Sequence, residues 1–509
     1  MNNINKKFKI AVLINSYTLE KWKHKILNDL QNSNIADMSF FLINEKDEKN
    51  SGNFLYRLYE KLDRNVFSKS GAFKELAEEE NALEMVEIPN QVQNDENNFD
   101  IILNLSKKKC PDSLKKAKYG VWFFSFGDEN GFLKAPFLKE LYENNPLSKC
   151  SLDALIDNEE KVLYSSYSST NPFSLYINQN KNYWKASDFV LRCLKVGADL
   201  CVCPVQKGAH AGAPLLCYPS NLFMFIFFIK LATRMFLQKA KNKFLKEQWF
   251  IAFTNKFHSF NIINPPKNRF FADPFLIQNK QKTYIFFEDY YYEKNKGVIS
   301  YMEILSNGAF SKPKTVLEKD YHLSYPFVFE EYGKFYMIPE TLGNRTIELY
   351  EAVDFPEQWK LKKVLFRDIN AVDSTLLKYN GKYWLFTNIA EKAGYLCDEL
   401  FLFYSDSLFG QWISHPKNPI VSDVRTARCA GKIFIYNGDL IRPSQETSIR
   451  YGYSLNFNKI ESLSEKAYKE KTIRKIKPES IKGNLAVHTY NSENGFEIID
   501  GMKIIGKHI

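Results

Sequence analysis

The sequence AVDSTLLKYNGKYWLFTN at residues 371–388 contains two short runs of apolar and aromatic residues on either side of the turn Asn-Gly-Lys. Two such runs separated by a tight turn are typical of paired antiparallel strands. Similar pairs recur along the second half of the chain, and their openings are about 50 residues apart, the period of a four-stranded propeller blade. The openings are ADPFLI (272–277), YPFVF (325–329), VDSTLL (372–377), RCAGKIFI (428–435) and the run 486–490. We therefore predict a five-bladed β-propeller over residues 249–509.

The composition is that of an ordinary globular protein. Of the 509 residues, 45% are hydrophobic and 25% are charged, which excludes extended disorder. The net charge of +10 is small for this length, and the basic residues do not alternate with aromatic ones, so nucleic-acid binding is not expected. The eight cysteines have no framework spacing. We expect neither a disulfide scaffold nor a metal site, and we expect a cytoplasmic location.

The first half of the chain follows another pattern, in which short apolar runs alternate with helical stretches. A helical stretch extends from Thr18 to Leu30, and residues 45–98, which are rich in Glu, Asn and Lys, are expected to form helices and a solvated loop. The apolar runs lie at residues 7–14, 38–43, 99–105 and 121–126. This alternation predicts an α/β domain with a mostly parallel sheet over residues 1–204.

Residues 205–248 are interpreted as a linker that contains an amphipathic helix. The apolar run Leu222–Ile229 is shorter than a membrane span and is followed by Arg234 and several lysines. One interpretation is a helix packed between the two domains. The other is a basic amphipathic helix lying on an anionic membrane surface, which would place the protein at the inner face of the membrane.

The propeller half resembles two groups of proteins. ADPFLI, YPFVFEEYGKFYMIPE and AVDSTLLKYNGKYWLFTN resemble the opening blades of the five-bladed propeller glycosidases, which include arabinanases, β-xylosidases and invertases. WFIAF, FADPF, MIPE, VDST, RCAG and IRPSQE, in this order, are similar to the N-terminal propeller domain of the plant glucosamine inositolphosphorylceramide transferases and their bacterial relatives. Both resemblances imply a protein that acts on carbohydrate.

The first strand of each propeller blade lines the central channel, so acidic residues at different blade openings can converge there. Cleavage or transfer of a glycosidic bond needs one protonated and one ionised carboxyl group. The resemblance to the glycosidases implies that Asp273 is the base or nucleophile and that Asp373 tunes it. The glycosidases carry a general-acid Glu at the fourth opening, where this chain has residues 427–431 without a carboxylate. Glu340 and Glu446, each at the end of a second strand, are the alternative acids. The other interpretation is that each Asp satisfies backbone donors in a turn and that each Glu is a strand-end charge.

Basic and aromatic residues supply candidate substrate contacts. Arg428, Arg442 and Arg450 suit phosphate or carboxylate recognition, which favours a phosphorylated sugar, a phospholipid-linked glycan or a uronic acid. The further candidates are His322, Tyr325 and Trp384. The alternatives are that the arginines pair with carboxylates between blades and that the aromatic residues belong to the blade core.

The N-terminal half resembles the Rossmann-like formyltransferase domain of methionyl-tRNA and sugar-nucleotide formyltransferases. The resemblance rests on KIAVLI, DIILNL and KYGVWFFSFGDENG. It implies that Asn104 and Asp128 match two members of the formyl-transfer site, whereas Ser125 and Phe126 stand where the family has histidines. Because Phe cannot carry a proton, we predict a degenerate domain that does not use folate and serves as a scaffold or binds a nucleotide-sugar.

These observations predict a carbohydrate-active enzyme of cell-surface glycan synthesis or remodelling, with no cofactor and with a nucleotide-sugar or sugar phosphate as a suitable substrate. The partner would be a carbohydrate or a glycolipid, with peripheral contact to a membrane surface. The alternatives are a module that binds glycan or phospholipid without catalysis, and residual formyl transfer to an amino sugar by the N-terminal domain.

Overall fold

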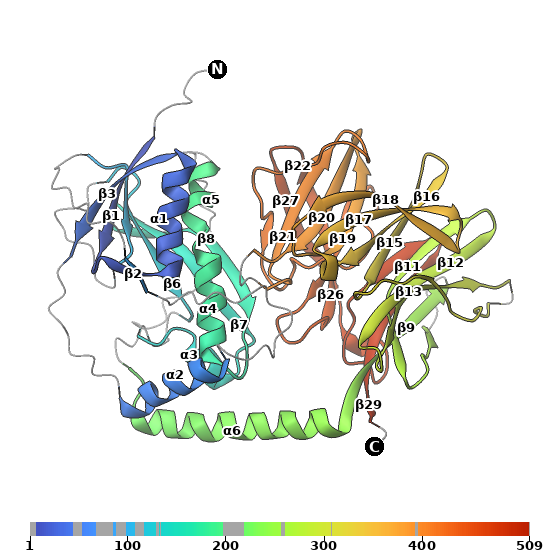
Figure 1. The fold of residues 1–509 in the computed structure, drawn as a ribbon, viewed down its shortest axis with the longest axis horizontal. Coiled ribbons are helices and arrows are strands. Elements are labelled where there is room, and N and C mark those ends of the chain that lie inside the picture. Colours follow the sequence, from blue (N-terminus) through green and yellow to red (C-terminus); the bar gives the residue numbers. More distant parts are fainter. Residues whose placement is uncertain are drawn as a thin grey trace. The chain divides into compact units, whose positions relative to one another are not determined.

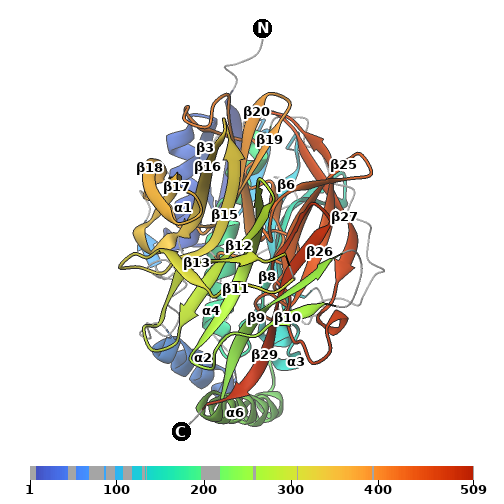
Figure 2. The same cartoon turned by 90° about the vertical axis from the view of Figure 1, so that its right-hand side faces the viewer.

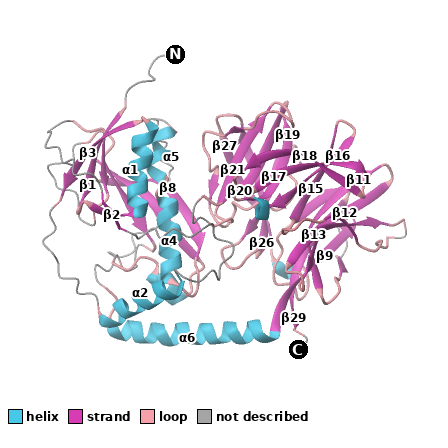
Figure 3. Ribbon diagram, in the orientation of Figure 1, coloured by secondary structure: helices cyan, strands magenta, loops and turns pink. Residues whose placement is uncertain are grey.

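The chain divides into two compact units. The N-terminal unit comprises Met1–Met235 with Glu391–Gly394, and the C-terminal unit comprises Phe236–Ala390 with Tyr395–Ile509. Helices are concentrated in the first unit and strands in the second (Figure 3). The computed structural model describes residues 7–43, 53–67, 85–87, 98–106, 117–128, 132, 134–196, 218–255, 260–306, 308–391 and 395–507.

The N-terminal unit is built on a six-stranded sheet with the order β3-β1-β5-β6-β7-β8 (Figure 1). The first four of these strands are parallel, as predicted, and β7 and β8 form an antiparallel hairpin at one edge that the sequence pattern did not indicate. The strands are β1 (Phe8–Ile14), β3 (Ala36–Leu42), β5 (Ile101–Asn104), β6 (Val121–Phe126), β7 (Leu147–Ile156) and β8 (Glu159–Ser169). A separate pair joins β2 (Thr18–Glu20) to β4 (Met85–Glu87).

Helices cover one face of this sheet. Alternate residues of β1, such as Ile10 and Val12, face the core that contains Trp22 and Trp184 from the helices. Successive side chains of a β-strand point to opposite faces of the sheet, so every second residue of β1 faces this core. The helices of the unit are α1 (Lys21–Ser33), α2 (Phe54–Phe67), α3 (Leu138–Glu143), α4 (Leu175–Ala186) and α5 (Phe189–Lys195). The predicted α/β organisation is therefore present, as a mixed sheet.

The C-terminal unit is a five-bladed β-propeller, which confirms the prediction from the repeat (Figure 2). Blade 1 contains β11 (Arg269–Asn279), β12 (Lys282–Tyr291), β13 (Lys296–Ile304) and β14 (Lys314–Leu317). Blade 2 contains β15 (Ser324–Glu331), β16 (Lys334–Thr341), β17 (Thr346–Asp354) and β18 (Gln358–Arg367). Blade 3 contains β19 (Ala371–Tyr379), β20 (Lys382–Ile389), β21 (Glu399–Ser405), β22 (Ile413–Ser414) and β23 (Val421–Ser422). Blade 4 contains β24 (Phe434–Tyr436), β25 (Asp439–Glu446), β26 (Ser454–Leu463) and β27 (Tyr468–Ile476).

Blade 5 closes the ring by combining the two ends of the propeller sequence. It contains β28 (Tyr490–Glu493), β29 (Phe496–Gly506), β9 (Leu245–Asn255) and β10 (Asn261–Ile263). The antiparallel pair of β9 and β29 extends from Leu245↔Gly506 to Asn255↔Phe496. Strand β9 begins within the segment that the sequence analysis assigned to the linker, because residues 245–248 pair with this last strand. Single-turn 3-10 helices occur at Leu342–Asn344 and Pro478–Ser480.

The first two strands of most blades are joined by the same tight turn. Asn380 and Gly381 in blade 3 have φ angles of 50° and 73°, and the corresponding pairs of blades 2, 4 and 5 also have two positive φ angles. Two successive left-handed residues are the signature of a type I′ turn, which favours Asn-Gly and matches the twist of a β-hairpin. The turn signals in the sequence therefore reflect a backbone requirement.

The helix that follows the N-terminal domain is longer than its apolar run suggested. Helix α6 (Asn221–Phe244) has 24 residues, and an 18-residue window in it has a mean hydropathy of 1.3. By length and composition it falls in the range of membrane spans, and 11% of that window is buried. The residues 208–213, interpreted as part of the linker, lie outside the described residues.

Candidate active site

The opening strands of blades 1, 2 and 3 share one backbone irregularity. Asp273, Tyr325 and Asp373 have φ angles of 50°, 43° and 51°. At each of them the pairing with the second strand shifts, as between Ala272 and Phe275 in blade 1. A β-bulge of this kind changes the direction in which a side chain points. Non-glycine residues with positive φ angles are concentrated at functional sites. The same device thus orients one side chain from each of three blades.

Acidic residues from three blades meet in one cluster. Asp273 of blade 1 interacts electrostatically with Asp373 of blade 3. Glu340, from the end of β16 in blade 2, also interacts electrostatically with Asp373. The side chains of Asp373 and Glu340 are 2% and 9% exposed, and Asp273 is buried. The structure therefore brings together both sequence-predicted aspartates and one of the two candidate acids.

Arg428 of blade 4 neutralises part of this acidic cluster. Its Nε lies 2.6 Å from Asp373 Oδ2 and its Nη2 lies 4.0 Å from Glu340 Oε2. Its Nη1 donates to Cys397 Sγ, and Gln445 Nε2 donates to the same Asp373 oxygen at 3.2 Å. Burial opposes the charge of Arg428, but Asp373 together with Tyr451, Cys397 and Glu340 raises the pKa of the guanidinium. Arg428 acts here as a partner of Asp373, so the cluster combines a cation with three carboxyl groups.

On the other side, Asp273 contacts blade 5. Thr489 Oγ1 donates to Asp273 Oδ1 at 2.7 Å, and the Nε2 atom of His488 lies 3.5 Å from the same oxygen. The Nδ1 atom of His488 is 2.5 Å from Asp500 Oδ2, and the ring stacks on Trp249 at 4.1 Å. Burial lowers the pKa of His488, but Asp500 and Asp273 together raise it above its usual value. The His488 ring thus lies between two carboxyl groups that favour its charged form.

Glu288, at the end of β12 in blade 1, is an additional acid that the sequence analysis missed. It pairs with Ala272, just as Glu340 pairs with Ser324 in blade 2, so the two glutamates occupy equivalent positions. His322 Nε2 lies 3.5 Å from Glu288 Oε1. The second strands contain FFED in blade 1 and MIPE in blade 2. Comparing them blade by blade would have identified Glu288 as a candidate.

The carboxyl groups of this cluster differ in their affinity for protons. Burial, followed by repulsion from Asp373, raises the pKa of Glu340 well above its usual value. Burial, followed by repulsion from Asp273, does the same for Glu288. The pKa of Asp273 is raised to about 6 by burial, with opposition from His488. Burial thus favours the protonated form of both glutamates, whereas His488 favours the ionised form of Asp273, and this is the pairing that acid–base chemistry requires.

Two side chains at this site reach solvent. Tyr451 is 41% exposed, and its ring lies 4.9 Å from the guanidinium carbon of Arg428 and 5.4 Å from the His488 ring. His322 is 39% exposed, and its Nδ1 accepts the backbone N–H of Gly297 at 2.9 Å. Desolvation lowers the pKa of His322 to about 4, so this ring is neutral. These two partly exposed residues lie beside the buried acids, and Tyr451 presents an aromatic face.

The remaining predicted residues have other partners. Glu446 accepts from Ser448 and pairs with Lys475 at 3.3 Å, so it does not join the acid cluster. Arg442 forms a bidentate pair with Glu470 of the same blade at 2.6 and 2.8 Å, whereas the alternative in the sequence analysis was a pair between blades.

The predicted aromatic contacts also serve the scaffold. Trp384 is buried in the hydrophobic core of the propeller and donates to Tyr379 O. The hydroxyl of Tyr325 accepts the N–H of Gly431 at 2.7 Å and bonds Thr375, while its own N–H holds Asp273 at 3.3 Å. Tyr325 is therefore placed to position Asp273.

Arg450 shares one feature with Arg442. Among the described residues its Nη1 atom is buried without a hydrogen-bond partner. It precedes Tyr451 in the loop between β25 and β26. A buried guanidinium nitrogen without an acceptor is costly, and an anionic group of a ligand would satisfy it.

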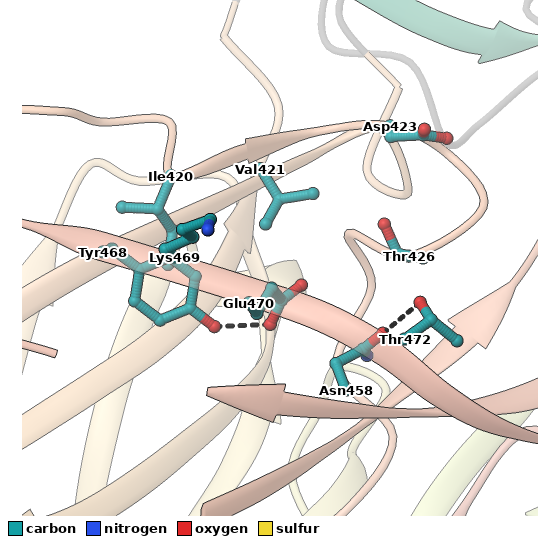
Figure 4. A pocket seen from close by; sticks show the side chains of 9 residues that line it. All are labelled: Ile420, Val421, Asp423, Thr426, Asn458, Tyr468, Lys469, Glu470 and Thr472. Carbon is teal, nitrogen blue, oxygen red and sulfur yellow. Dashed lines mark hydrogen bonds between the residues drawn. The ribbon is translucent and has the colours of Figure 1, made fainter. Parts of the chain in front are cut away.

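A cavity of about 330 Å³ lies elsewhere, beside the outer strands of blade 4 (Figure 4). Tyr468 donates to Glu470 there, and Thr472 donates to Asn458 at 2.7 Å. Because Glu470 is already paired with Arg442, this hollow lacks a free acid and is separate from the acid cluster.

The candidate formyl-transfer residues lie in the N-terminal unit. Asn104 ends β5 and accepts two hydrogen bonds from Ser106. Asp128 follows β6 and pairs with Lys139 at 3.3 Å. Phe126, which stands in place of a histidine, packs against the Tyr183 ring at 4.6 Å. The segment 107–116, which includes most of SKKKCPDSL, lies outside the described residues.

Asp273, His488 and Asp500 also offer ligand atoms within 4.8 Å of one another, which is close enough to hold a metal ion. Their oxygens already receive hydrogen bonds, including those from the N–H groups of His488 and Thr489 to Asp500 Oδ1 at 2.9 and 3.0 Å. These bonds satisfy the group as an ion-pair network.

Comparison with known proteins places the similarity in the propeller. Residues 258–496 match the family model described as glucosamine inositolphosphorylceramide transferase 1, N-terminal. The proteins named glucosamine inositolphosphorylceramide transferase 1 from Oryza sativa subsp. japonica and Arabidopsis thaliana are 37% and 38% identical over 225 and 220 residues. These regions are 43% and 42% of this chain but 30% and 28% of the relatives, so the chain spans under a third of their length. The relatives are plant proteins.

Three solved structures are similar to the propeller. Zg3597, a family 117 glycoside hydrolase of Zobellia galactanivorans, has 12% identity and a TM-score of 0.35, covering 50% of this chain and 90% of its own. RS223-β-xylosidase has 12% identity and a TM-score of 0.36, covering 47% and 93%. The family 32 β-fructofuranosidase BmSUC1 of Bombyx mori has 13% identity and a TM-score of 0.35, covering 54% and 61%.

Proposed function

We propose that this protein is a carbohydrate-active enzyme that breaks and forms glycosidic bonds at the acid cluster of the propeller. The observation that carries this proposal is the meeting of Asp273, Glu340 and Asp373 from three blades, with proton affinities that differ. A binding module would need no such set of buried carboxyl groups, each of which costs stability. The similarity to proteins named glucosamine inositolphosphorylceramide transferase 1 supports the same class of chemistry.

In the proposed mechanism Glu340 donates its proton to the leaving oxygen as the bond from the anomeric carbon breaks. Asp273 takes the proton from the hydroxyl that attacks this carbon, which belongs to water in cleavage and to an acceptor in transfer. Asp373 raises the pKa of Glu340, and Arg428, which pairs with Asp373 and lies 4.0 Å from Glu340, opposes this effect. Tyr451 offers a face for a sugar ring, and Arg450 suits a phosphate or carboxylate on the substrate.

The test is the release or transfer of sugar from a panel of nitrophenyl glycosides, sugar phosphates and nucleotide-sugars. We expect Asp273→Asn and Glu340→Gln each to lower kcat by at least about a hundredfold, the usual contribution of a general acid or base. Neither should lower the melting temperature, because an uncharged amide is easier to bury than a carboxylate.

Glu446→Gln is the matched control, since Glu446 is buried but lies among Ser448 and Lys475. It should keep its activity. Activity that survives Asp273→Asn at the wild-type level would refute the proposed role.

For the N-terminal unit we propose a formyltransferase-type scaffold without formyl transfer. The packing of Phe126 between aromatic rings supports this, because no proton carrier stands at that position. Calorimetry with a formyl-folate should show no binding. Tight binding would revive the alternative in which Asn104 and Asp128 act on an amino sugar.

A further inference from the structure

Helix α6 leaves an apolar face uncovered along its whole length. Phe225 is 58% exposed and Phe236 is 72% exposed. The other exposed apolar residues of the helix are Leu222, Ile226, Ile229, Met235, Leu237 and Phe244. Contiguous exposed apolar surface of this kind marks an interaction site.

Helix α2 carries a second uncovered stripe. Phe54, Leu58, Leu62 and Val66 follow one another at intervals of four residues, so they lie on one face of the helix, and all are exposed. The opposite face buries Tyr56 and Tyr59 in a core shared with α6.

Helix α2 and the first part of α6, up to Met235, lie side by side in the N-terminal unit. The Tyr59 ring contacts the Phe227 ring at 5.0 Å, and Asn53 Nδ2 donates to Pro219 O just before α6 begins. Two neighbouring helices therefore present apolar side chains to the surroundings from one part of the unit.

The charge of these helices is positive. The segment Asn221–Phe244 contains five basic residues and no Asp or Glu. Lys239 and Lys243 are exposed on the second half of α6, and α2 presents Arg57, Lys61 and Arg64. Exposed apolar residues with flanking lysines and arginines are typical of helices that lie at the surface of an anionic membrane.

The packing of α6 against the N-terminal unit favours a helix that lies on a membrane over one that crosses it. Met224, Phe227 and Leu231 are buried in the core of the N-terminal unit. Arg234 donates to the carbonyls of Leu141 and Pro172 at 3.2 and 2.6 Å. Because one side of residues 224–234 is covered by protein, too few residues remain for lipid to surround the helix across a bilayer.

We propose that the exposed faces of α2 and α6 form a docking surface for an anionic lipid bilayer, with both helices lying in the interface. This inference is independent of the chemistry proposed for the propeller. It gives the positive charge and the uncovered apolar residues of these helices one common function.

The test is flotation of the full-length protein with vesicles of phosphatidylcholine, alone or with phosphatidylserine as about a third of the lipid. The wild-type protein should bind the anionic vesicles, and raised salt should weaken binding. The triple variant Phe225→Gln, Ile229→Gln, Phe236→Gln should lose at least about tenfold in affinity because three exposed apolar side chains no longer insert into the membrane. The variant Lys239→Gln, Lys243→Gln should lose about fivefold for each lysine.

The matched control replaces exposed apolar residues of the propeller, Leu361→Gln with Ile473→Gln, and should bind like the wild type. The Asp273→Asn variant should also bind, so a failed catalytic proposal would leave this one intact. Circular dichroism establishes that each variant is folded. Equal binding of the wild type and the triple variant, or no binding of the wild type, would overturn the proposal. A wild-type dimer that the triple variant abolishes, without vesicle binding, would assign the surface to self-association instead.

Discussion

Asp273 and Glu340 share one cluster but hold their protons with different strength. Desolvation acts on both, while His488 favours the ionised form of Asp273 and Asp373 opposes ionisation of Glu340. The base must be ionised and the acid protonated, so activity should rise as pH passes about 6 and fall where Glu340 loses its proton. We expect a bell-shaped profile of kcat/KM against pH, measured on any substrate that the panel identifies. Glu340→Gln should abolish the alkaline limb, and an acid limb near pH 4, typical of an ordinary Asp, would contradict the assignment.

Arg428 should be essential for stability as well as for activity. Removing it leaves Asp373 and Glu340 buried without their cation, which costs about 3–5 kcal/mol. We expect urea unfolding of Arg428→Gln to show a loss of this size.

The control is Arg425→Gln, whose partner Asp423 is partly exposed, and which should cost less than about 1 kcal/mol. Equally small losses of unfolding free energy for the two variants would show that the ion pair between Arg428 and Asp373 does not stabilise the fold.

At this scale the sequence predicted the positions of Asp273 and Asp373, because each stands at a recognisable strand opening. It could not choose between Glu340 and Glu446, since both end a second strand and only the register of pairing separates them. His488 and Asp500 were missed because their importance depends on contacts with Asp273, which is more than 200 residues away in the sequence.

The blades that form the site contain two kinds of glycine with a positive φ angle, which differ in the space around them. Gly381, in a hairpin turn, has a φ angle of 73°, and a Cβ atom added to it would contact nothing. Gly431 has a φ angle of 126°, and a Cβ atom added to it would clash with its neighbours. A methyl group at Gly431 would lie 1.9 Å from Tyr490 O.

We therefore expect Gly381→Ala to cost about 1 kcal/mol of unfolding free energy from backbone strain alone. Gly431→Ala should cost several times more, because backbone must also move. Gly506→Ala, with no positive φ and open space, is the control and should be close to neutral. Equal losses of unfolding free energy for the Gly381 and Gly431 variants, in a thermal or urea melt, would contradict the inference that close packing excludes a side chain at Gly431.

Local signals sufficed to predict most elements. The parallel strands of the N-terminal unit and the blade hairpins follow from apolar runs and Asn-Gly turns, which act over a few residues. The β7–β8 hairpin and the full length of α6 were not predicted, since the polar residues of the hairpin and the lysines of the helix obscure their patterns.

For the molecule as a whole, the propeller ring is what unites acids from three blades. The repeat predicted the number of blades, but the pairing of β9 with β29 joins opposite ends of the propeller sequence and leaves no local signal. Closure of the ring brings Asp500 and His488 beside Asp273, so the site is a property of the complete ring.

The most direct measurement is a double-mutant cycle of Asp273→Asn and Glu340→Gln, with kcat/KM determined on one substrate. If the two carboxyl groups act on the same bond, the double variant should be no more than about a few-fold slower than the slower single variant. Losses that multiply, or a single variant with wild-type activity, would contradict a shared catalytic centre.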